Sequence, residues 1–500
     1  MEGKNIVMDK EKKFKKVLNI WDVLVVAFGA MIGWGWVVSS GGWIQSGGIL
    51  GTIVGFAIGG LMIFFVGLTY AELTPAMPKT GGEHLFSYKA FGPTGSFICT
   101  WALILSYVGV VCYEAVSLPT ILQYIFPGIL RGYMYTVAGF DVYATWVAIG
   151  ASFAILLVIL NIIGIKKAAI FQKVLTAVIA IVGILLFVAS LFTGNSDNIA
   201  SQLFVGDNFG GAFNNIIKVA MVTPFFFFGF DVIPQASEEI NIKPQKIGIV
   251  MLLSIILAVA FYSIVVLGIG FVFNGQDITN SMNGSGLVTA DAMAKAFGSS
   301  VMAKVLIIGG LCGIITSWNS FLIGGSRAIY SMSESFMIPR TFSKVSNRAK
   351  SPYMALILVG ALSVVAPFFG RTMLVWIVDA ATFACCLAYC MVAVSFLIIR
   401  KKYPDMERPF KIKHYKVVGI IAIILSAAVV LMYLIPGTGC TLVWQEWIIV
   451  GGWLLLGIGF FIWSKLKYKE KFATNIDSNS DLEDENNIVE QKNTKDEQQP

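Results

Sequence analysis

The sequence predicts an all-α membrane protein with about twelve transmembrane helices. Of its 500 residues, 57% are hydrophobic and only 13% are charged, an apolar excess that soluble globular domains do not show. Apolar stretches of the roughly 20 residues that a helix needs to cross a bilayer recur along the whole chain. Positive charges alternate between successive connections, as the positive-inside rule expects of a protein that crosses the membrane many times.

Twelve apolar segments can be delimited by hydropathy. The regular alternation of basic and non-basic connections supports this number. The segments are 18–44, 48–74, 94–125, 144–164, 169–193, 213–238, 247–273, 303–330, 352–370, 372–399, 416–436 and 444–464.

Most of the 36 lysines and arginines lie in the N-terminal arm, beside the connections after even-numbered segments, and near the C terminus. The positive-inside rule therefore predicts that both termini are cytoplasmic. The first segment is too long for a secretory signal and no small-residue cleavage site follows it, so we expect no cleavable signal peptide. The expected location is the cell membrane, with multiple passes.

The two ends differ in charge. Residues 1–17 form a basic arm, whereas residues 472–500 are polar, acidic and poor in aromatic residues after Phe472, which is typical of disorder. The basic excess of the remaining chain suits anionic lipid headgroups and not nucleic acid. The seven cysteines show no disulfide or zinc spacing, and we expect no metal or cofactor.

The first segment contains an interruption, GAMIGWGWVVSSGGWIQSGG at 29–48. Glycine weakens a helix, and irregular backbone at membrane depth persists only where protein or a water-filled cavity satisfies it. Free N–H groups at such a break attract a carboxylate, and free carbonyls attract an ammonium group or a cation. The alternative is that these glycines only let helices pack closely.

The sixth segment is interrupted as well, by Pro224, Gly229 and Pro234, with Asp231 between the breaks. Each interruption falls in the first segment of a five-segment unit, which is the pattern that indicates a transporter binding site. Because five is odd, the two units have opposite orientations. We therefore predict an inverted repeat, 18–193 and 213–400, followed by two extra helices over 416–464.

Six motifs resemble those of the amino acid–polyamine–organocation (APC) superfamily, and within it bacterial amino acid permeases. The resemblance covers about residues 18–465 and implies the LeuT-like fold of five plus five helices, with alternating access around a site at the midplane. The motifs are GAMIGWG (29–35), TYAELTPAMPKTGGEHLFSYKAFG (69–92), NIIGIKKAAIFQ (161–172), FFFFGFDVIPQASEE (225–239), SRAIYSMSESFMIPRTFSKV (326–345) and RKKYPDMERPFKI (400–412).

The resemblance also implies a substrate site. The carboxylate site falls on the backbone of helix one, and the amino-group site on carbonyls of helix one and of the phenylalanine run, where Phe225 matches an aromatic gate. The phenylalanines have an alternative role as lipid-facing or core bulk, and Trp34 either narrows the pocket or packs away from it. The implied binding residues are Met31, Ile32, Gly33, Trp34, Gly35, Phe225, Phe226, Phe227 and Phe228.

Acidic residues within the membrane are further candidates, because charge in the bilayer is costly. Asp231 matches a common family position and is expected either to cap the broken helix or to couple protons. Glu114 is expected to form a salt bridge, with Lys218 as the partner, to bind a proton, or to balance the charge of a basic substrate. His84 and His414 lie in cytoplasmic connections, where we expect them to be solvated.

The resemblance implies a candidate coupling site too. Some proton-coupled relatives carry a lysine in the middle of helix five, where this chain has Ile179. A sodium site of the LeuT-like fold would use carbonyls of Gly29 and Ile32 with hydroxyls of Thr316 and Ser317. The alternative is that both hydroxyls bond back to their own helix. We therefore expect sodium coupling or ion-independent exchange.

The predicted function is secondary active transport of an amino acid or a related amine. The alternative within the same fold is an obligatory exchanger of amino acids or organic amines, and a membrane sensor or channel-like protein is the alternative outside it. No motif of a protease, a nucleotide hydrolase or an α/β-hydrolase is present in the sequence, so we do not expect an enzyme.

Overall fold

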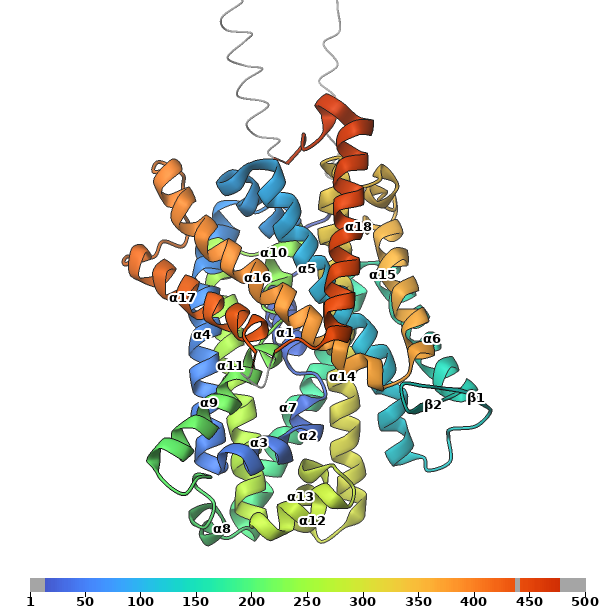
Figure 1. Cartoon of the computed structure of the whole chain (residues 1–500), viewed down its shortest axis with the longest axis vertical. Helices are drawn as coiled ribbons and strands as arrows, with labels where there is room; N and C mark the ends of the chain where they lie inside the picture. Colours follow the sequence, from blue (N-terminus) through green and yellow to red (C-terminus); the bar gives the residue numbers. More distant parts are fainter. Residues whose placement is uncertain (1–13, 437–440, 477–500) are drawn as a thin grey trace, which may run out of the picture.

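The computed structural model describes residues 14–436 and 441–476, and it shows a bundle of long helices (Figure 1). Among these residues nine helices are long and apolar enough to cross a membrane, and Ile20–Met31 and Tyr353–Phe369 are shorter apolar helices. The all-α membrane class is therefore confirmed. The long helices are α4 (Ile49–Ala76), α5 (Gly82–Ile125), α6 (Ala144–Ile163), α7 (Ile165–Thr193), α11 (Pro244–Val272), α14 (Ser300–Glu334), α16 (Thr372–Lys402), α17 (Tyr415–Leu434) and α18 (Trp444–Tyr468), and α15 is Tyr353–Val365 with η3 (Ala366–Phe369) after it.

Both predicted interruptions are confirmed. The first segment consists of α1 (Ile20–Met31), α2 (Gly35–Val38) and α3 (Ser40–Gly47), and the sixth consists of α9 (Phe209–Phe226), α10 (Val232–Gln235) and the short η1 (Ser237–Glu239). Helix α1 ends because Ile32 leaves the helical region, with φ −101° and ψ 80°.

The two interruptions lie against each other. Gly229 has φ +128°, and a Cβ atom there would lie 2.4 Å from the Cβ atom of Ala30. Only glycine combines this backbone conformation with so close an approach. The glycine in the sixth segment therefore brings the two broken segments into contact.

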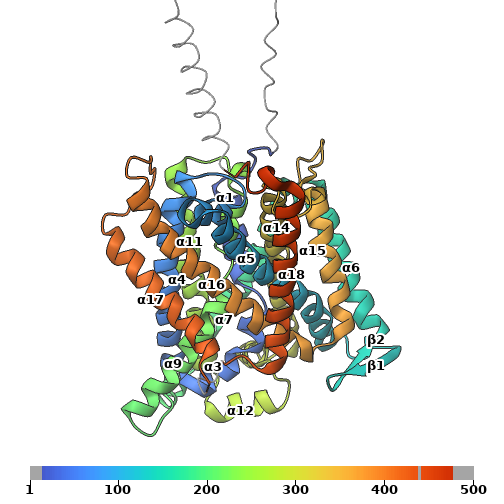
Figure 2. The same cartoon turned by 45° about the horizontal axis from the view of Figure 1, so that its top comes forward.

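Short elements connect the long helices. They are the antiparallel hairpin β1 (Tyr133–Val137) and β2 (Phe140–Tyr143), together with α8 (Ser196–Ala200), α12 (Gly275–Asn283), α13 (Val288–Phe297), η2 (Arg340–Ser343) and η4 (Lys469–Lys471). Figure 1 shows α8 and α12 at the end of the bundle opposite to the last turns of α18, and Figure 2 shows the same for α12. The connections 194–212 and 272–299 both follow odd-numbered predicted segments, and their position at one end agrees with the alternation of the predicted segments.

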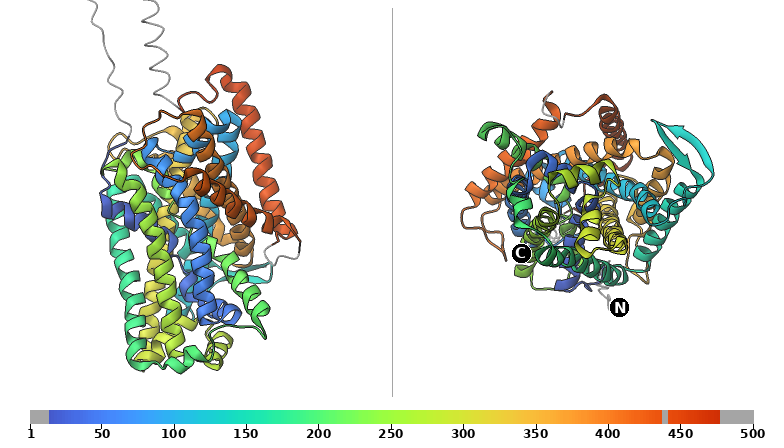
Figure 3. Two further views of the ribbon diagram at one scale, coloured as in Figure 1. Left: turned by 90° about the vertical axis from the view of Figure 1, so that its left-hand side faces the viewer. Right: turned by 90° about the horizontal axis from the view of Figure 1, so that it is seen from below.

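The predicted extra helices lie at the edge of the bundle. Figure 3 shows α18 along one side of the bundle in its left view, and α17 at the edge of the bundle in the view from below. Helix α18 is fixed to α5 by Trp101 and Trp453, whose rings stack 4.4 Å apart and whose indole nitrogens each donate to the other residue's carbonyl at 2.9 Å. No described residue of either helix lines the cavity between the two broken segments that is described below.

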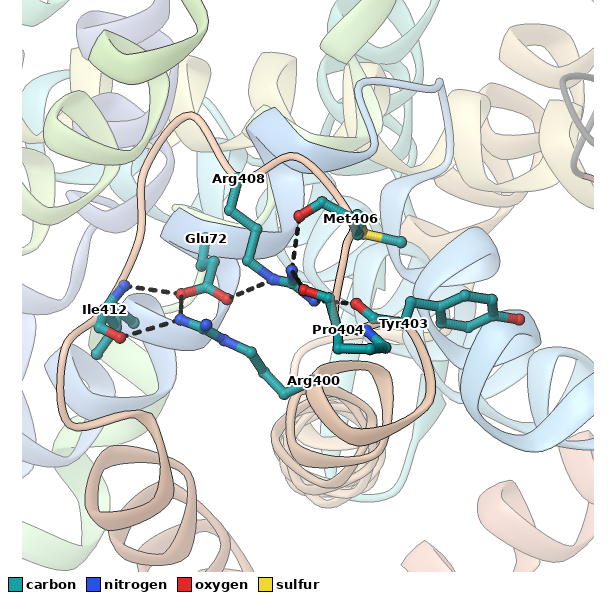
Figure 4. A network of polar contacts seen from close by, with 7 residues as sticks. All are labelled: Glu72, Arg400, Tyr403, Pro404, Met406, Arg408 and Ile412. Atoms are coloured by element: carbon teal, nitrogen blue, oxygen red, sulfur yellow. Dashed lines mark hydrogen bonds and ion pairs between the residues drawn. The ribbon is translucent and has the colours of Figure 1, made fainter.

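An ion-pair network ties α4 to the connection that follows α16 (Figure 4). The buried Glu72 carboxylate accepts from Arg400 at 2.6 Å and from the Ile412 backbone at 2.8 Å, and its other oxygen lies 3.2 Å from Arg408. Arg408 also donates to the carbonyl of Tyr403. These partners give the TYAEL and RKKYPDMERPFKI motifs a structural role at one end of the bundle.

The sequence predicts disorder from residue 472 onward, but residues up to 476 make contacts with the bundle. Ala473 donates its backbone N–H to the Ser335 carbonyl at 2.9 Å, and Lys79 donates to the carbonyls of Asn475 and Ile476. Residues 472–476 therefore pack against the bundle. The remaining part of the prediction, 477–500, and most of the basic arm, 1–13, lie outside the described residues.

Candidate functional site

A buried cavity of about 200 Å³ lies between the two broken segments. Its wall combines the break after α1 with α9, with residues well inside α5 and α14, and with the first turns of α16. The predicted binding residues that line it are Met31, Gly33, Trp34, Gly35, Phe225, Phe226 and Phe228. Ile32 and Phe227 are both fully buried and do not line it. Phe227 packs edge-on against Phe56 and Tyr262, so the core alternative applies to this phenylalanine.

The break after α1 presents free backbone polar groups. The N–H groups of Gly33 and Trp34 have no hydrogen-bond partner among the described residues. A Cβ atom at Gly313 of α14 would lie 2.4 Å from the Gly33 carbonyl oxygen and 2.9 Å from that of Ile32. Gly313 thus lets α14 approach the break closely, which excludes water from one side of it and leaves the other side facing the cavity.

Glu114 is the charged residue of the cavity wall. Its side chain is 2% exposed, its Oε1 atom would lie 3.2 Å from a Cβ atom at Gly33, and its Oε2 atom has no hydrogen-bond partner. The predicted salt bridge with Lys218 is wrong, because Lys218 is exposed beside a separate outer cavity. No basic side chain of residues 14–436 or 441–476 pairs with Glu114. A buried carboxyl group with an unused oxygen therefore faces the site.

Two aromatic residues separate this cavity from a smaller one of about 120 Å³. Trp34 and Tyr113 line both cavities, and the smaller one is also lined by Arg371. The Trp34 indole lies on α14, where a Cβ atom at Gly310 would be 2.2 Å from its ring. Of the two roles left open by the sequence, the structure favours the first: Trp34 lines and narrows the cavity, and its ring also packs on α14.

The sequence did not single out Tyr113, Val110, Phe321 or Val378, which also line the cavity. Val110, Tyr113 and Glu114 share one face of α5, because they are three and four residues apart. This spacing from Glu114 could have indicated that Val110 and Tyr113 also face the cavity. Nothing in the sequence indicated Phe321 or Val378, because only the fold brings α14 and α16 to the cavity.

Asp231 lies deeper in the sixth segment, away from the cavity lining. It is fully buried and accepts hydrogen bonds from the hydroxyls of Tyr107 at 2.6 Å and Tyr389 at 2.9 Å, and from the Gly229 N–H at 2.9 Å. These contacts support the structural alternative, in which Asp231 holds the break in shape.

The candidate sodium site contains a neutral amide. Gln172 of α7 places its Nε2 atom 2.5 Å from the position of a Cβ atom at Gly29, and it donates to the Thr316 carbonyl at 3.0 Å and to the Ser320 hydroxyl at 2.9 Å. The Thr316 hydroxyl donates to the Gly313 carbonyl of its own helix at 2.9 Å. The sequence reasoning missed Gln172, although a polar residue in an apolar segment was a usable signal.

The cavity is closed toward the end of the bundle that holds η1. There Arg327 donates through two nitrogens to the two oxygens of Glu239, each at 3.0 Å, and both side chains are buried. The backbone N–H groups of Val17 and Leu18 donate to the Glu239 carbonyl at 2.9 Å. The chain before α1, η1 and α14 thus close one exit.

The prediction of a solvated His84 is wrong. Its ring is 2% exposed, and its Nδ1 atom lies 2.9 Å from the hydroxyls of Thr100 and Ser96 while Nε2 lies 2.8 Å from that of Ser335. The connection after α4 folds back as the first turns of α5, which buries the ring. His414 is exposed, as predicted.

Two helices broken at facing positions around a buried cavity, within a helical protein that crosses the membrane many times, define a membrane transporter. Comparison with known families names the group more closely. The model of the amino acid permease family, of the APC superfamily, matches residues 22–477, and the chain belongs to this family.

Similar proteins include three transporters of Bacillus subtilis (strain 168). A branched-chain amino acid permease is 28% identical over 91% of this chain and 94% of its own length, and a methylthioribose transporter is 26% identical over 91% and 95%. An aspartate-proton symporter is 24% identical over 85% and 80%. These relatives span nearly the whole chain and confirm the predicted class.

Proposed function

We propose that this permease moves a small α-amino acid across the cell membrane by alternating access, with both termini in the cytoplasm. The substrate carboxylate accepts hydrogen bonds from the free N–H groups of Gly33 and Trp34. The ammonium group faces Glu114. The observation that carries this proposal is the meeting of free backbone donors and a carboxyl group with one unused oxygen in one cavity of about 200 Å³.

The charges favour a zwitterionic ligand. An ionised Glu114 has no positive partner among the described residues of the cavity wall, and the ammonium group of a bound amino acid would supply one while the backbone N–H groups hold its carboxylate. The apolar remainder of the wall, including Phe225, Phe321 and Val378, suits an aliphatic or thioether side chain. The branched-chain permease among the relatives agrees with such a substrate.

The methylthioribose relative makes a different ligand class worth testing. A thiosugar has neither a carboxylate nor an ammonium group, so it would leave the break and Glu114 without their partners. Binding of radiolabelled amino acids to purified protein, with competition by decarboxylated analogues and by methylthioribose, separates the two. An amine or a thiosugar that competes as well as the parent amino acid contradicts the carboxylate role.

Obligatory exchange is the second candidate mode of transport. Its support is Gln172, which bridges helices near the candidate sodium site without a charge. Flux into proteoliposomes tests it: an exchanger takes up label only when unlabelled substrate is present inside, whereas a coupled symporter accumulates label from an empty start. A sensor would bind substrate without flux in either case.

A further inference from the structure

The buried acidic residues near the closed end of the bundle fall into two groups. Asp22, Glu72 and Glu239 are each paired with a lysine or an arginine within 3.2 Å. Glu83, in the first turn of α5, is fully buried as well. Among the described residues no basic side chain lies within ion-pair distance of it. A charge in this position would be uncompensated, which is costly in a low-dielectric interior.

The contacts of Glu83 suit a neutral carboxyl group. Its Oε2 atom accepts a hydrogen bond from the Gln235 side-chain amide. Its Oε1 atom makes no hydrogen bond of good geometry, although the Tyr70 hydroxyl lies close to the carboxyl group. One amide donor and a poorly aligned hydroxyl are little compensation for a buried negative charge.

Asp231 is a second buried carboxyl group in the same region, and the donors around each group indicate which of the two holds a proton. Asp231 interacts electrostatically with Glu83 and receives two tyrosine hydroxyls and one backbone N–H. Three donors at hydrogen-bond distance stabilise the ionised form of Asp231, whereas Glu83 accepts one well-formed hydrogen bond, from Gln235. The titratable groups facing Glu83 are Asp231, Tyr70, Tyr107 and Cys99, and none of them carries a positive charge.

We propose that Glu83 is a proton-binding site inside the gate that closes the cavity at this end, and that it holds a proton while the gate is closed. The start of α5 rests directly on the inner half of the sixth segment: the Gly81 N–H donates to the Gln235 carbonyl at 3.2 Å, and a Cβ atom at Gly82 would lie 2.5 Å from that of Pro234. Separation of these elements exposes Glu83 to water, where it releases its proton.

The consequence for transport rests on the proposed function, but the protonation state of Glu83 does not. The first experiment therefore needs no flux. Infrared difference spectra of the purified protein in H₂O and D₂O at neutral pH should contain the carbonyl band of a protonated buried carboxyl group. Glu83→Gln should remove that band or part of its intensity. The matched control Glu238→Gln, on η1, should leave it unchanged. A spectrum of Glu83→Gln identical to that of the wild type overturns the proposal.

A second experiment tests the link to the gate. Glu83→Gln stays neutral and so should favour the closed gate. It should bind external substrate normally, lose at least tenfold in turnover, and lose the dependence of turnover on internal pH. Glu83→Asp can still release a proton, so it should restore part of the turnover and part of its dependence on internal pH. If Glu83→Gln keeps the wild-type pH profile, the gate proton lies elsewhere. If neither the wild type nor any variant transports an amino acid, the proposed function fails, but the infrared result still decides the protonation state of Glu83.

Discussion

Glu114 and Gly33 face each other in the cavity, so close that a Cβ atom on residue 33 would lie 3.2 Å from the Glu114 Oε1 atom. One residue comes from the middle of α5 and the other from the break after α1. A single small space therefore holds a buried carboxyl group and the free backbone of the broken helix. The first predictions follow from this arrangement.

Leucine at either glycine of the break should abolish substrate binding. A side chain at residue 33 would enter the space before Glu114, and one at residue 35 would start 2.2 Å from the Phe226 ring. Loss of one hydrogen bond to a charged group costs roughly 1.5–3 kcal/mol, or about tenfold to a hundredfold in affinity, and steric exclusion should exceed this. Equilibrium binding to the purified variants measures it.

A matched control for this test is available in α18. Gly452 is exposed at the edge of the bundle, and a Cβ atom there meets nothing within 4 Å. Gly452→Leu should therefore bind substrate like the wild type. Normal binding by Gly33→Leu and Gly35→Leu would show that the substrate lies elsewhere.

Trp34→Ala should preserve binding and change the preferred substrate size. The indole lines two cavities and packs on Gly310, while the Trp34 backbone N–H stays in place to donate. Removal of the ring should join the cavities, so larger amino acids should gain affinity relative to small ones. Competition by amino acids of increasing size measures the ratio of their affinities. An unchanged order of affinities would show that Trp34 does not limit the size of the substrate.

Uptake should continue when sodium is replaced by choline at fixed pH, if Gln172 takes the place of a cation between α7 and α14. Its amide already satisfies the Thr316 carbonyl and the Ser320 hydroxyl. Gln172→Ala should slow transport in either medium because it removes the acceptor of the buried Asn319 amide and one donor to the Thr316 carbonyl. Complete loss of wild-type uptake in choline would instead support the sodium site of Gly29, Ile32, Thr316 and Ser317.

Glu239→Ala should destabilise the closed state more than a double replacement does. It leaves the Arg327 guanidinium buried without its partner, which costs about 3–5 kcal/mol. Glu239→Gln combined with Arg327→Met removes both charges and should recover part of that loss. Thermal unfolding of the purified variants compares them, and equal melting temperatures for the wild type and Glu239→Ala would show that the pair contributes little.

Cysteines placed at Ser285 and Asn347 should report opposite sides of the membrane. Both positions are exposed, the first in the connection between α12 and α13 and the second between η2 and α15. With both termini in the cytoplasm, an impermeant maleimide should label Ser285→Cys in intact cells. It should label Asn347→Cys only after permeabilisation. The reverse pattern would invert the predicted orientation.

The sequence by itself determined the all-α membrane class and the positions of both interruptions. These properties are local: hydropathy over about 20 residues marks a spanning helix, and glycine or proline weakens a helix wherever it stands. The motifs around 29–35 and 225–239 therefore located backbone that lines the cavity, and the comparisons confirmed the family that these motifs resemble.

Only the tertiary structure decided which side chains meet. Glu114 and Lys218 are compatible in charge, but α5 turns one into the cavity while the other faces outward. His84 stands in a polar motif, yet the fold buries its ring against Ser335. Gln172 meets Thr316, 144 residues away. Such pairs depend on how separate helices pack, and packing is set by many contacts across the whole bundle, so no local pattern in the chain records them.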